Sequence, residues 1–336
     1  MKRVFVSHPS DKLDAYFGDK ATRALQAIAE VRFNSEPREL ATSELIAAAQ
    51  GCDALIAYRQ TPGPEALFRE LPRLAAFIRC AVDIRTVDVA AASRHGVLVT
   101  QATPGYITAV AEWILAAMID LGRGLSRYVE AYHRGETPAP TMGRELRGST
   151  LGVIGFGQIG QHLADLALAL SMRVVVTTLQ PIGPHPRLRQ VALPALLAES
   201  DFVVCLAPAN AETENLLDAA AFATMKPGAF FVNAARGELV DDAALLQALD
   251  SGRLAGAALD VGRAPDQMPA PALARHPRVV AAPHIAGLTR PATEHQALET
   301  VAQLGHLLRG EVPEGAVNAA QATRWRAWPD EKGSTP

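Results

Sequence analysis

The sequence predicts an α/β protein with two parallel-sheet domains and a cleft between them. Short apolar segments alternate with helical patterns along most of the 336 residues, and this alternation is typical of parallel sheets covered by helices. A glycine-rich turn, Gly155–Gly160, lies between one apolar segment and the helical pattern after it. The length allows two ordinary domains, each with its own hydrophobic core.

Composition excludes several classes of protein. The formal net charge of −3 predicts no nucleic-acid partner. No segment reaches the roughly 18 apolar residues of a membrane span or resembles a signal peptide, so we expect a cytoplasmic protein without a membrane partner. Three cysteines, Cys52, Cys80 and Cys205, lack metal-ligand spacing. We expect buried thiols in a reducing compartment and no metal site.

The first hundred residues form one α/β unit in this interpretation. A strand over Arg3–Ser7 is followed by a helix near 14–28 and a second strand over Val31–Asn34. Further strands are expected at Ala54–Tyr58, Ala76–Cys80 and Val97–Thr100.

A long helical stretch follows, from about Thr108 to His133. Its apolar residues cover more than one face, which predicts burial against another domain or another subunit, and we expect a homodimer. The next residues, 135–143, are rich in Pro, Gly and Thr and are expected to form a surface loop.

A second α/β unit begins at Leu151. Strands are expected at Leu151–Gly155, Arg173–Thr177, Phe202–Leu206, Ala229–Asn233, Ala255–Asp260 and Val279–Ala282, with a final helix near 291–308. The last residues carry Trp325 and Trp328, whose exposure would suggest that this tail docks on something. The expected boundaries are 1–102 with 286–318 for a substrate domain, 103–285 for a dinucleotide-binding domain, and 319–336 for the tail.

The turn Gly155–Gly160 matches G-x-G-x-x-G and lies in the strand–turn–helix context that the motif requires. Gly155 permits the tight turn, Gly157 lets the backbone approach a pyrophosphate, and Gly160 lets the helix pack against the strand. Gln158 and Ile159 belong to the same helix start, whose free N–H groups attract phosphate. The turn predicts a Rossmann-like domain that binds NAD(H) or NADP(H), and the other domain is expected to be Rossmann-like or flavodoxin-like.

An acidic residue usually follows the second strand of such a domain and binds the ribose hydroxyls. Thr178 stands there, in a segment without a carboxylate, so NADP(H) is not excluded. Arg187 and Arg189 follow shortly afterwards. They are candidates to bind a 2′-phosphate, although ordinary surface arginines are the favoured interpretation.

Two residues at strand ends are suited to reduce a keto acid. Arg236 and His284 each follow a predicted strand at its carboxyl end, where open α/β sheets bind ligands. A guanidinium binds a carboxylate bidentately and polarises a neighbouring carbonyl. Histidine changes charge near neutral pH and is suited to transfer the proton that accompanies a hydride.

The chain resembles the D-isomer-specific 2-hydroxyacid dehydrogenases over roughly residues 50–310. The resemblance is strongest at Gly143–Gly155, Met225–Gly228, Val232–Asp241, Ala258–Val261 and Ala282–Gly287, and looser at 87–92, 103–105 and 110–112. It implies that Arg236 and His284 are catalytic and that the reaction is reversible hydride transfer.

The resemblance also implies the roles of further residues. Asp260 should contact the nicotinamide carboxamide, and Ala234 should lie close to it through its backbone. The remaining cofactor contacts implied are Leu206, Pro208, Thr213 and Gly287. In the substrate domain Arg59 and Gln60 are expected to face the cleft, with a solvated loop end as the alternative for Arg59.

Two segments depart from the family pattern. The glutamate that orients the catalytic histidine falls on Pro265, and Asp266 is the nearest carboxylate. We favour Asp266 as its replacement, with solvent or another group as the alternative. The substrate loop Cys80–Thr86 lacks its usual glycines, which makes Asp83 and Arg85 candidates for substrate selection.

We therefore expect an enzyme that interconverts a small 2-keto acid, such as glyoxylate, hydroxypyruvate or pyruvate, and the corresponding 2-hydroxy acid. Two alternatives stay open. One is a dehydrogenase of the same fold that acts on formate, phosphite or phosphoglycerate. The other is a dinucleotide-sensing interaction protein that has lost turnover.

Overall fold

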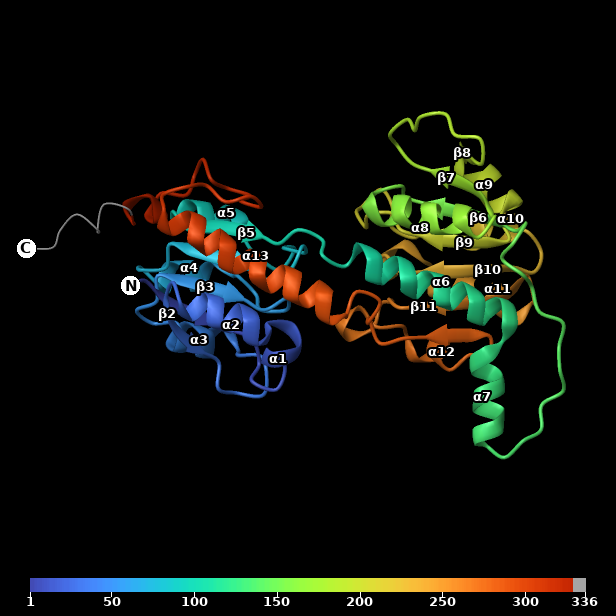
Figure 1. The fold of residues 1–336 in the computed structure, drawn as a ribbon, viewed down its shortest axis with the longest axis horizontal. Helices are drawn as coiled ribbons and strands as arrows, with labels where there is room; N and C mark the ends of the chain where they lie inside the picture. The colour runs from blue at the N-terminus through green and yellow to red at the C-terminus, as the bar shows by residue number, and fades with distance from the viewer. Residues whose placement is uncertain (329–336) are drawn as a thin grey trace, which may run out of the picture. The chain divides into compact units, whose positions relative to one another are not determined.

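The computed structural model describes residues 1–328, and the chain divides into two compact units. Unit 1 consists of residues 1–106 and the segment from Thr289 onward, and unit 2 consists of Ile107–Leu288. Each unit is built on one parallel sheet (Figure 1). The predicted fold class, two Rossmann-like parallel-sheet domains, is confirmed.

Unit 1 has a five-stranded sheet in the order β2-β1-β3-β4-β5, and every neighbouring pair is parallel. The strands are β1 Arg3–Val6, β2 Glu30–Phe33, β3 Ala54–Ala57, β4 Ala76–Arg79 and β5 Leu98–Gln101. The helices are α1 Leu13–Tyr16, α2 Gly18–Gln26, α3 Thr42–Ala48, α4 Glu65–Glu70, α5 Val89–Arg94 and α13 Arg290–Leu308, with a 3-10 turn η3 at Arg324–Ala327.

Alternate residues of these strands enter two separate cores, one on each face of the sheet. Val4 and Val6 pack with residues of α2 and α13, whereas Phe5 packs with residues of α3, α4 and α5. This period of two is what a strand buried on both faces requires. The expected helix near 14–28 is interrupted at Gly18, whose φ of 76° does not belong to a right-handed helix.

The expected exposure of the two tryptophans was wrong, whereas the segment that carries them does dock, as the tail prediction suggested. Trp325 and Trp328 are buried in the core of unit 1 that also contains α2 and α13. The side chain of Lys2 lies 5.4 Å above the Trp328 ring. The site on which this segment docks is therefore the core of its own unit. The rest of the predicted tail, 329–336, lies outside the described residues.

Unit 2 has a seven-stranded parallel sheet in the order β12-β11-β10-β9-β6-β7-β8. The strands are β6 Thr150–Ile154, β7 Arg173–Thr177, β8 Leu188–Gln190, β9 Phe202–Cys205, β10 Ala229–Asn233, β11 Leu254–Leu259 and β12 Val279–Ala281. The helices are α6 Ile107–Arg123, α7 Leu125–His133, α8 Gln158–Ala169, α9 Leu193–Glu199, α10 Ala219–Thr224, α11 Asp242–Asp250 and α12 Pro271–Ala274, with 3-10 turns η1 Gly237–Leu239 and η2 Pro265–Gln267.

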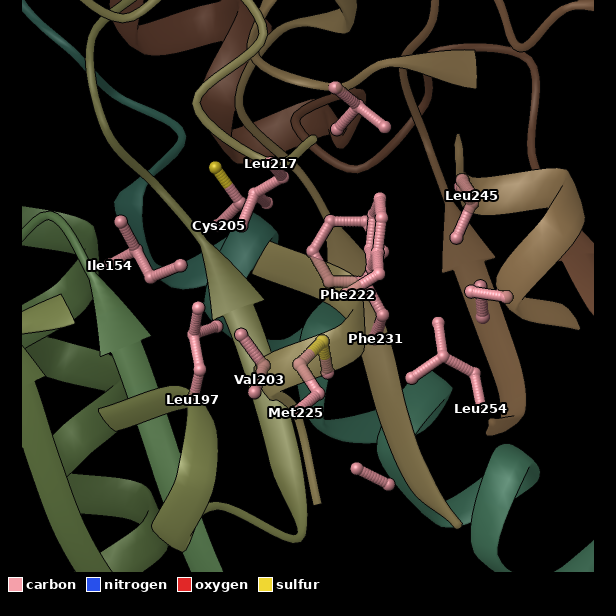
Figure 2. Close-up of a cluster of buried hydrophobic side chains, with 14 of the residues drawn as sticks. Ile154, Leu197, Val203, Cys205, Leu217, Phe222, Met225, Phe231, Leu245 and Leu254 are labelled. Atoms are coloured by element: carbon pink, nitrogen blue, oxygen red, sulfur yellow. The ribbon is translucent and has the colours of Figure 1, made fainter. Parts of the chain in front are cut away.

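The core of unit 2 between the sheet and α9 to α11 is almost entirely aliphatic and aromatic. Figure 2 shows Val203, Cys205 and Phe231 from the sheet against Phe222 and Leu245 from the helices. Three-residue β8 was not predicted, because Leu188 is the only apolar residue in it. It extends the sheet beyond β7.

The expected long helix is two helices in the structure. Gly124 adopts a φ of 67° and separates α6 from α7. α6 packs on α8, β10 and β11 of its own unit, so its buried residues, such as Ile114 and Met118, need no second domain or subunit. α7 buries only Ala131. In Figure 1 it projects from the body of unit 2.

All three cysteines are buried and form no disulfide, as expected. Within residues 1–328, no group of three or more His, Cys, Asp or Glu side chains is arranged to hold a metal ion. The same residues contain no helix with the length and apolar character needed to span a bilayer.

A buried histidine follows β1 and predicts a pH dependence of stability. The ring of His8 is 1% exposed and lies between Phe17 and Tyr58, with centroid distances of 5.2 and 5.1 Å. Neither ring nitrogen has a hydrogen-bond partner among the described residues. Burial lowers the pKa of His8 from 6.5 to about 3, so the folded protein keeps this imidazole neutral.

We expect unit 1 to lose stability between pH 7 and pH 5 because of His8. Below pH 6.5 the unfolded chain binds a proton that the folded chain refuses, so stability is present above that pH and is lost as the pH falls toward 3. The loss between pH 7 and 5 should be about 2 kcal/mol. His8→Leu should remove this increment, because leucine does not titrate. Denaturant unfolding followed by tryptophan fluorescence measures it, and equal pH slopes for the two proteins would contradict the assignment.

Candidate active site

The glycine-rich turn connects β6 to α8 at the point where strand order reverses. β7 lies on one side of β6 and β9 on the other, so the crevice at their carboxyl ends is a topological switch point. α8 begins at Gln158, and the N–H groups of Gln158, Ile159 and Gly160 are among the first of the helix, which have no partner within it.

Two glycines of the turn are required by close backbone contacts. Gly155 has a φ of 92°, and a Cβ atom on it would lie 2.7 Å from the backbone of Leu206 and Ala207. A Cβ atom on Gly160 would lie 2.6 Å from the carbonyl oxygen of Gly155. A Cβ atom on Gly157 would meet nothing within 4 Å, so the space beside it is open to a ligand. This arrangement supports the roles that the motif predicted.

The segment after β9 lies against the same turn. Leu206 and Ala207 are the residues that the Gly155 Cβ atom would touch. Thr213 donates a hydrogen bond from its hydroxyl to the Pro208 carbonyl, at 2.8 Å, which closes the loop between them. The structure therefore brings Leu206 to the turn Gly155–Gly160. Contact of Leu206, Pro208 and Thr213 with the cofactor stays a prediction.

Thr178 follows β7, next to the turn, and the sequence of residues 177–180 contains no carboxylate. Its carbonyl accepts a hydrogen bond from the Gln190 amide at 2.8 Å. Arg189 forms an ion pair with Glu199, with 2.5 Å between nitrogen and oxygen, and its side chain is 61% exposed. This pairing favours the surface interpretation of Arg189. Arg187 is exposed in the loop before β8.

Arg236 is positioned by a buried asparagine. Asn233, the last residue of β10, accepts a hydrogen bond from the Ala235 N–H and donates one to the Arg236 carbonyl, at 3.1 and 2.9 Å. The Arg236 guanidinium donates to the Ala235 carbonyl at 2.7 Å. Ala234 lies within the same turn. Asn233 was not among the predicted site residues, although its place inside the Arg236 motif was a signal.

Asp260 holds the segment that carries His284. Its buried carboxylate accepts hydrogen bonds from the N–H groups of Ile285 and Ala286, at 2.7 and 2.9 Å. Its carbonyl accepts from the His284 N–H at 3.0 Å. Burial raises the pKa of Asp260, while the two N–H groups act in the opposite direction. The structure gives Asp260 this role in the loop, and a nicotinamide contact stays a prediction. Gly287 follows in the same loop.

His284 follows β12, next to β11, with Asp266 beside it. Its Nδ1 atom lies 3.0 Å from the main-chain carbonyl oxygen of Asp266, so the contact described is with the backbone of Asp266. β10, β11 and β12 are adjacent and parallel, so Arg236, Asp260 and His284 all follow the carboxyl edge of one sheet. A guanidinium and an imidazole at one edge are suited to bind a carboxylate and transfer a proton.

The substrate candidates of unit 1 follow two neighbouring strands of its sheet. Arg59 and Gln60 follow β3, and the Arg59 guanidinium lies 5.8 Å from the centre of the Tyr16 ring. Asp83 and Arg85 follow β4 and form an ion pair at 2.8 Å. Because the Asp83 carboxylate neutralises the Arg85 charge, Arg85 should bind a substrate carboxylate more weakly than an unpaired arginine would.

A buried arginine, which was not among the predicted site residues, holds the glycine-free loop Cys80–Thr86 in place. Arg79 ends β4 and is 1% exposed. It donates hydrogen bonds to the carbonyls of Tyr58, Thr61 and Asp83 and to the Thr86 hydroxyl, which ties the segments after β3 and β4 together. Burial lowers the pKa of Arg79 to about 10, so it remains charged at neutral pH. Its place inside a fully apolar strand pattern was the available signal.

Comparison with known proteins identifies relatives over most of the chain. D-3-phosphoglycerate dehydrogenase 3 of Arabidopsis thaliana is 34% identical over 288 residues, which are 84% of this chain and 49% of that protein. D-3-phosphoglycerate dehydrogenase of Archaeoglobus fulgidus is 32% identical over 303 residues, which are 87% of this chain and 57% of that protein. The chain thus spans about half the length of these relatives.

A solved structure, that of the TT0316 protein from Thermus thermophilus, is similar with a TM-score of 0.83 and 32% identity, and the match covers 94% of this chain and 99% of that one. Residues 115–286 match the family model described as the NAD binding domain of D-isomer specific 2-hydroxyacid dehydrogenases, which agrees with the expected NAD(H) cofactor. This match includes the phosphate turn, Arg236 and His284. The chain therefore belongs to the D-isomer specific 2-hydroxyacid dehydrogenase family.

Proposed function

We propose that this protein is an NAD(P)H-dependent dehydrogenase that reversibly reduces a small 2-keto acid to a 2-hydroxy acid. The observation that carries the proposal is the placement of Arg236 and His284 at the carboxyl edge of the sheet that also carries the phosphate turn. Glyoxylate, hydroxypyruvate and pyruvate are the substrates of choice, because each offers a carboxylate next to a carbonyl and little else.

The two side chains divide the work of the reaction. Arg236 binds the substrate carboxylate and draws charge toward the carbonyl oxygen. A nicotinamide cofactor held at the turn Gly155–Gly160 would supply the hydride, which the carbonyl carbon would accept as its π electrons move to the oxygen. His284 gives its proton to that oxygen, which completes the hydroxyl group, and the imidazole becomes neutral. Oxidation of the hydroxy acid is the reverse, with neutral His284 as the base.

The alternative substrate is a phosphoglycerate-type hydroxy acid. The two relatives described above bear that name, although the chain spans only about half their length. A larger substrate of this kind needs an additional cationic contact for its phosphate.

The test is oxidation of NADH and NADPH, followed by the loss of nicotinamide absorbance, over a panel of 2-keto acids that includes phosphohydroxypyruvate. We expect turnover with at least one small 2-keto acid and none with acetone, which lacks the carboxylate that Arg236 binds. Turnover confined to phosphohydroxypyruvate would replace the substrate class. NAD(H) binding without turnover of any acid would instead favour a dinucleotide-sensing protein.

Cofactor choice gives a second test. The sequence of residues 177–180 contains no carboxylate, so we expect NADPH to be used with an efficiency comparable to that of NADH. Thr178→Asp should shift the preference toward NADH at least ~10-fold, about 1.4 kcal/mol, because the new charge repels the 2′-phosphate. Thr178→Asn is the uncharged control. Steady-state kinetics with both cofactors measures the ratio, and a native enzyme that strictly requires NADH would show that another residue excludes the phosphate.

The proposal includes a symmetric homodimer. Leu125, Val129 and Tyr132 lie on one face of α7 and are each more than half exposed. Their spacing of four and three residues forms an apolar stripe, and such stripes mark interaction surfaces. The molar mass of the protein in solution, from light scattering, measures the assembly.

A further inference from the structure

The ring of His284 contacts a peptide carbonyl where the sequence led us to expect an acidic side chain. Nδ1 lies 3.0 Å from the main-chain oxygen of Asp266. A carbonyl oxygen only accepts hydrogen bonds, so Nδ1 must carry a hydrogen in this contact. In the neutral ring the other nitrogen, Nε2, is then without a hydrogen and is the atom that gains and loses the reactive proton.

The loop that presents this carbonyl is strained and closed on itself. Asp266 and Gln267 have φ values of 56° and 57°, a left-handed conformation that residues with a side chain rarely adopt, let alone in succession. Two hydrogen bonds close the loop: Gly262 N–H to the Gln267 carbonyl at 2.8 Å, and Ala264 N–H to the Met268 carbonyl at 3.0 Å. Strained backbone persists where its surroundings dictate it, and it gathers at functional sites.

The histidine side of the contact is held just as firmly. His284 has a φ of 57°, and Asp260 holds the segment through the N–H groups of His284, Ile285 and Ala286. The charged groups on the segments beside His284 are Asp260 after β11, Arg263 and Asp266 on the loop, and Arg236 after β10. Arg263 is paired with Glu214 at 2.8 Å. Both partners of the contact are thus set by backbone geometry.

We propose that the Asp266 main-chain carbonyl is the positioning group for His284, in the role that the family gives to a glutamate. The proposal rests on the proposed function, because it concerns the proton donor of that reaction. The carbonyl fixes the tautomer and the ring orientation as a carboxylate would. It carries no net charge, so it stabilises the imidazolium less than a carboxylate does. Keto-acid reduction should accordingly fade at a lower pH than in a variant with an acid at this place.

Three substitutions separate the carbonyl from the carboxylate. Asp266→Asn removes the charge and keeps the peptide. Gly262→Ala displaces the peptide, because its Cβ atom would lie 2.6 Å from the Pro269 Cα and 2.7 Å from the Met268 oxygen. Pro265→Glu restores an acid at the family position. Gly183→Ala is the control for a glycine substitution in a loop, since its Cβ atom would meet nothing within 4 Å.

The readouts are the ¹⁵N spectrum of histidine-labelled protein and the pH profile of reductive kcat/KM. The His284 signals are assigned by their loss in His284→Asn. We expect the Nδ1–H tautomer in the native protein and in Asp266→Asn, with the alkaline limb of the profile in the same place. Gly262→Ala should lose the tautomer preference. Its kcat should fall at least ~10-fold, with little change in NADH affinity. The control Gly183→Ala should behave as the native protein. Pro265→Glu should move the alkaline limb upward.

An alkaline limb that moves to lower pH in Asp266→Asn would overturn the proposal and assign the role to the carboxylate. A native Nε2–H tautomer would overturn it as well. If Gly262→Ala does not fold, as judged by circular dichroism, the Asp266→Asn profile and the native spectrum still decide. An Nδ1–H tautomer in a protein that reduces no keto acid would leave the positioning intact and reject the proposed function instead.

Discussion

Arg236→Lys should lower kcat/KM for keto-acid reduction at least ~100-fold, a loss of about 2.7 kcal/mol of transition-state stabilisation. Lysine keeps the positive charge but cannot form two parallel hydrogen bonds with a carboxylate. Its smaller set of donors also leaves the carbonyl less polarised as hydride arrives. The turn itself should survive, because Asn233 holds it through backbone atoms of Ala235 and Arg236.

The controls for this variant separate chemistry from folding. Arg147→Lys changes an exposed arginine outside the proposed site and should stay within about 2-fold of the native rate. The dissociation constant for NADH, measured by fluorescence, should change little in Arg236→Lys. Near-native turnover of the lysine variant would remove Arg236 from the catalytic assignment, and a large loss of NADH affinity would move it to the cofactor.

His284→Asn should lower kcat for reduction about 1000-fold, because asparagine has no proton to give at neutral pH and general acid catalysis contributes roughly 100- to 10,000-fold. Substrate binding should persist, since Arg236 still meets the carboxylate. The loss should therefore appear in kcat far more than in KM. Stopped-flow measurement of a single turnover isolates the chemical step from product release.

His133→Asn, at the exposed end of α7, is the matched control and should behave as the native enzyme. The residual activity of His284→Asn should also lose the alkaline limb of the native pH profile, because the group that must be protonated is gone. An unchanged rate, or an unchanged profile on a lower rate, would show that a different group delivers the proton.

Local periodicity predicted most of the fold. Most strands of both sheets are short apolar runs bounded by turn residues. Segments such as Val174–Val176 and Phe230–Val232 are apolar at every position, which is typical of parallel strands buried on both faces. The G-x-G-x-x-G turn indicated the dinucleotide domain, because tight turns and close backbone approach require glycine at set spacings. Strand order follows from neither signal, since it depends on pairing between distant segments.

Predictions failed where a contact reached across the chain. Trp325 and Trp328 are isolated aromatic residues in a polar segment, and only packing with α2 and α13 shows that they complete the core of unit 1. Gly124 interrupts an apolar pattern that continues through it, so composition alone could not separate α6 from α7. Three-residue β8 exists because β7 offers it an edge, and its own residues carry almost no strand signal.

The candidate site likewise has features that the local sequence predicted and features that depend on long-range contacts. The sequence by itself determined that Arg236 and His284 follow strands at their carboxyl ends, because each comes after an apolar run inside a recognisable motif. It also showed that the usual glutamate is missing. Only the tertiary structure decided what contacts His284. A sequence pattern predicts which side chains are present, whereas the group in contact is a peptide carbonyl, which every residue has. The direction of that carbonyl depends on the left-handed backbone of Asp266 and Gln267, which surrounding hydrogen bonds impose and no side-chain pattern encodes.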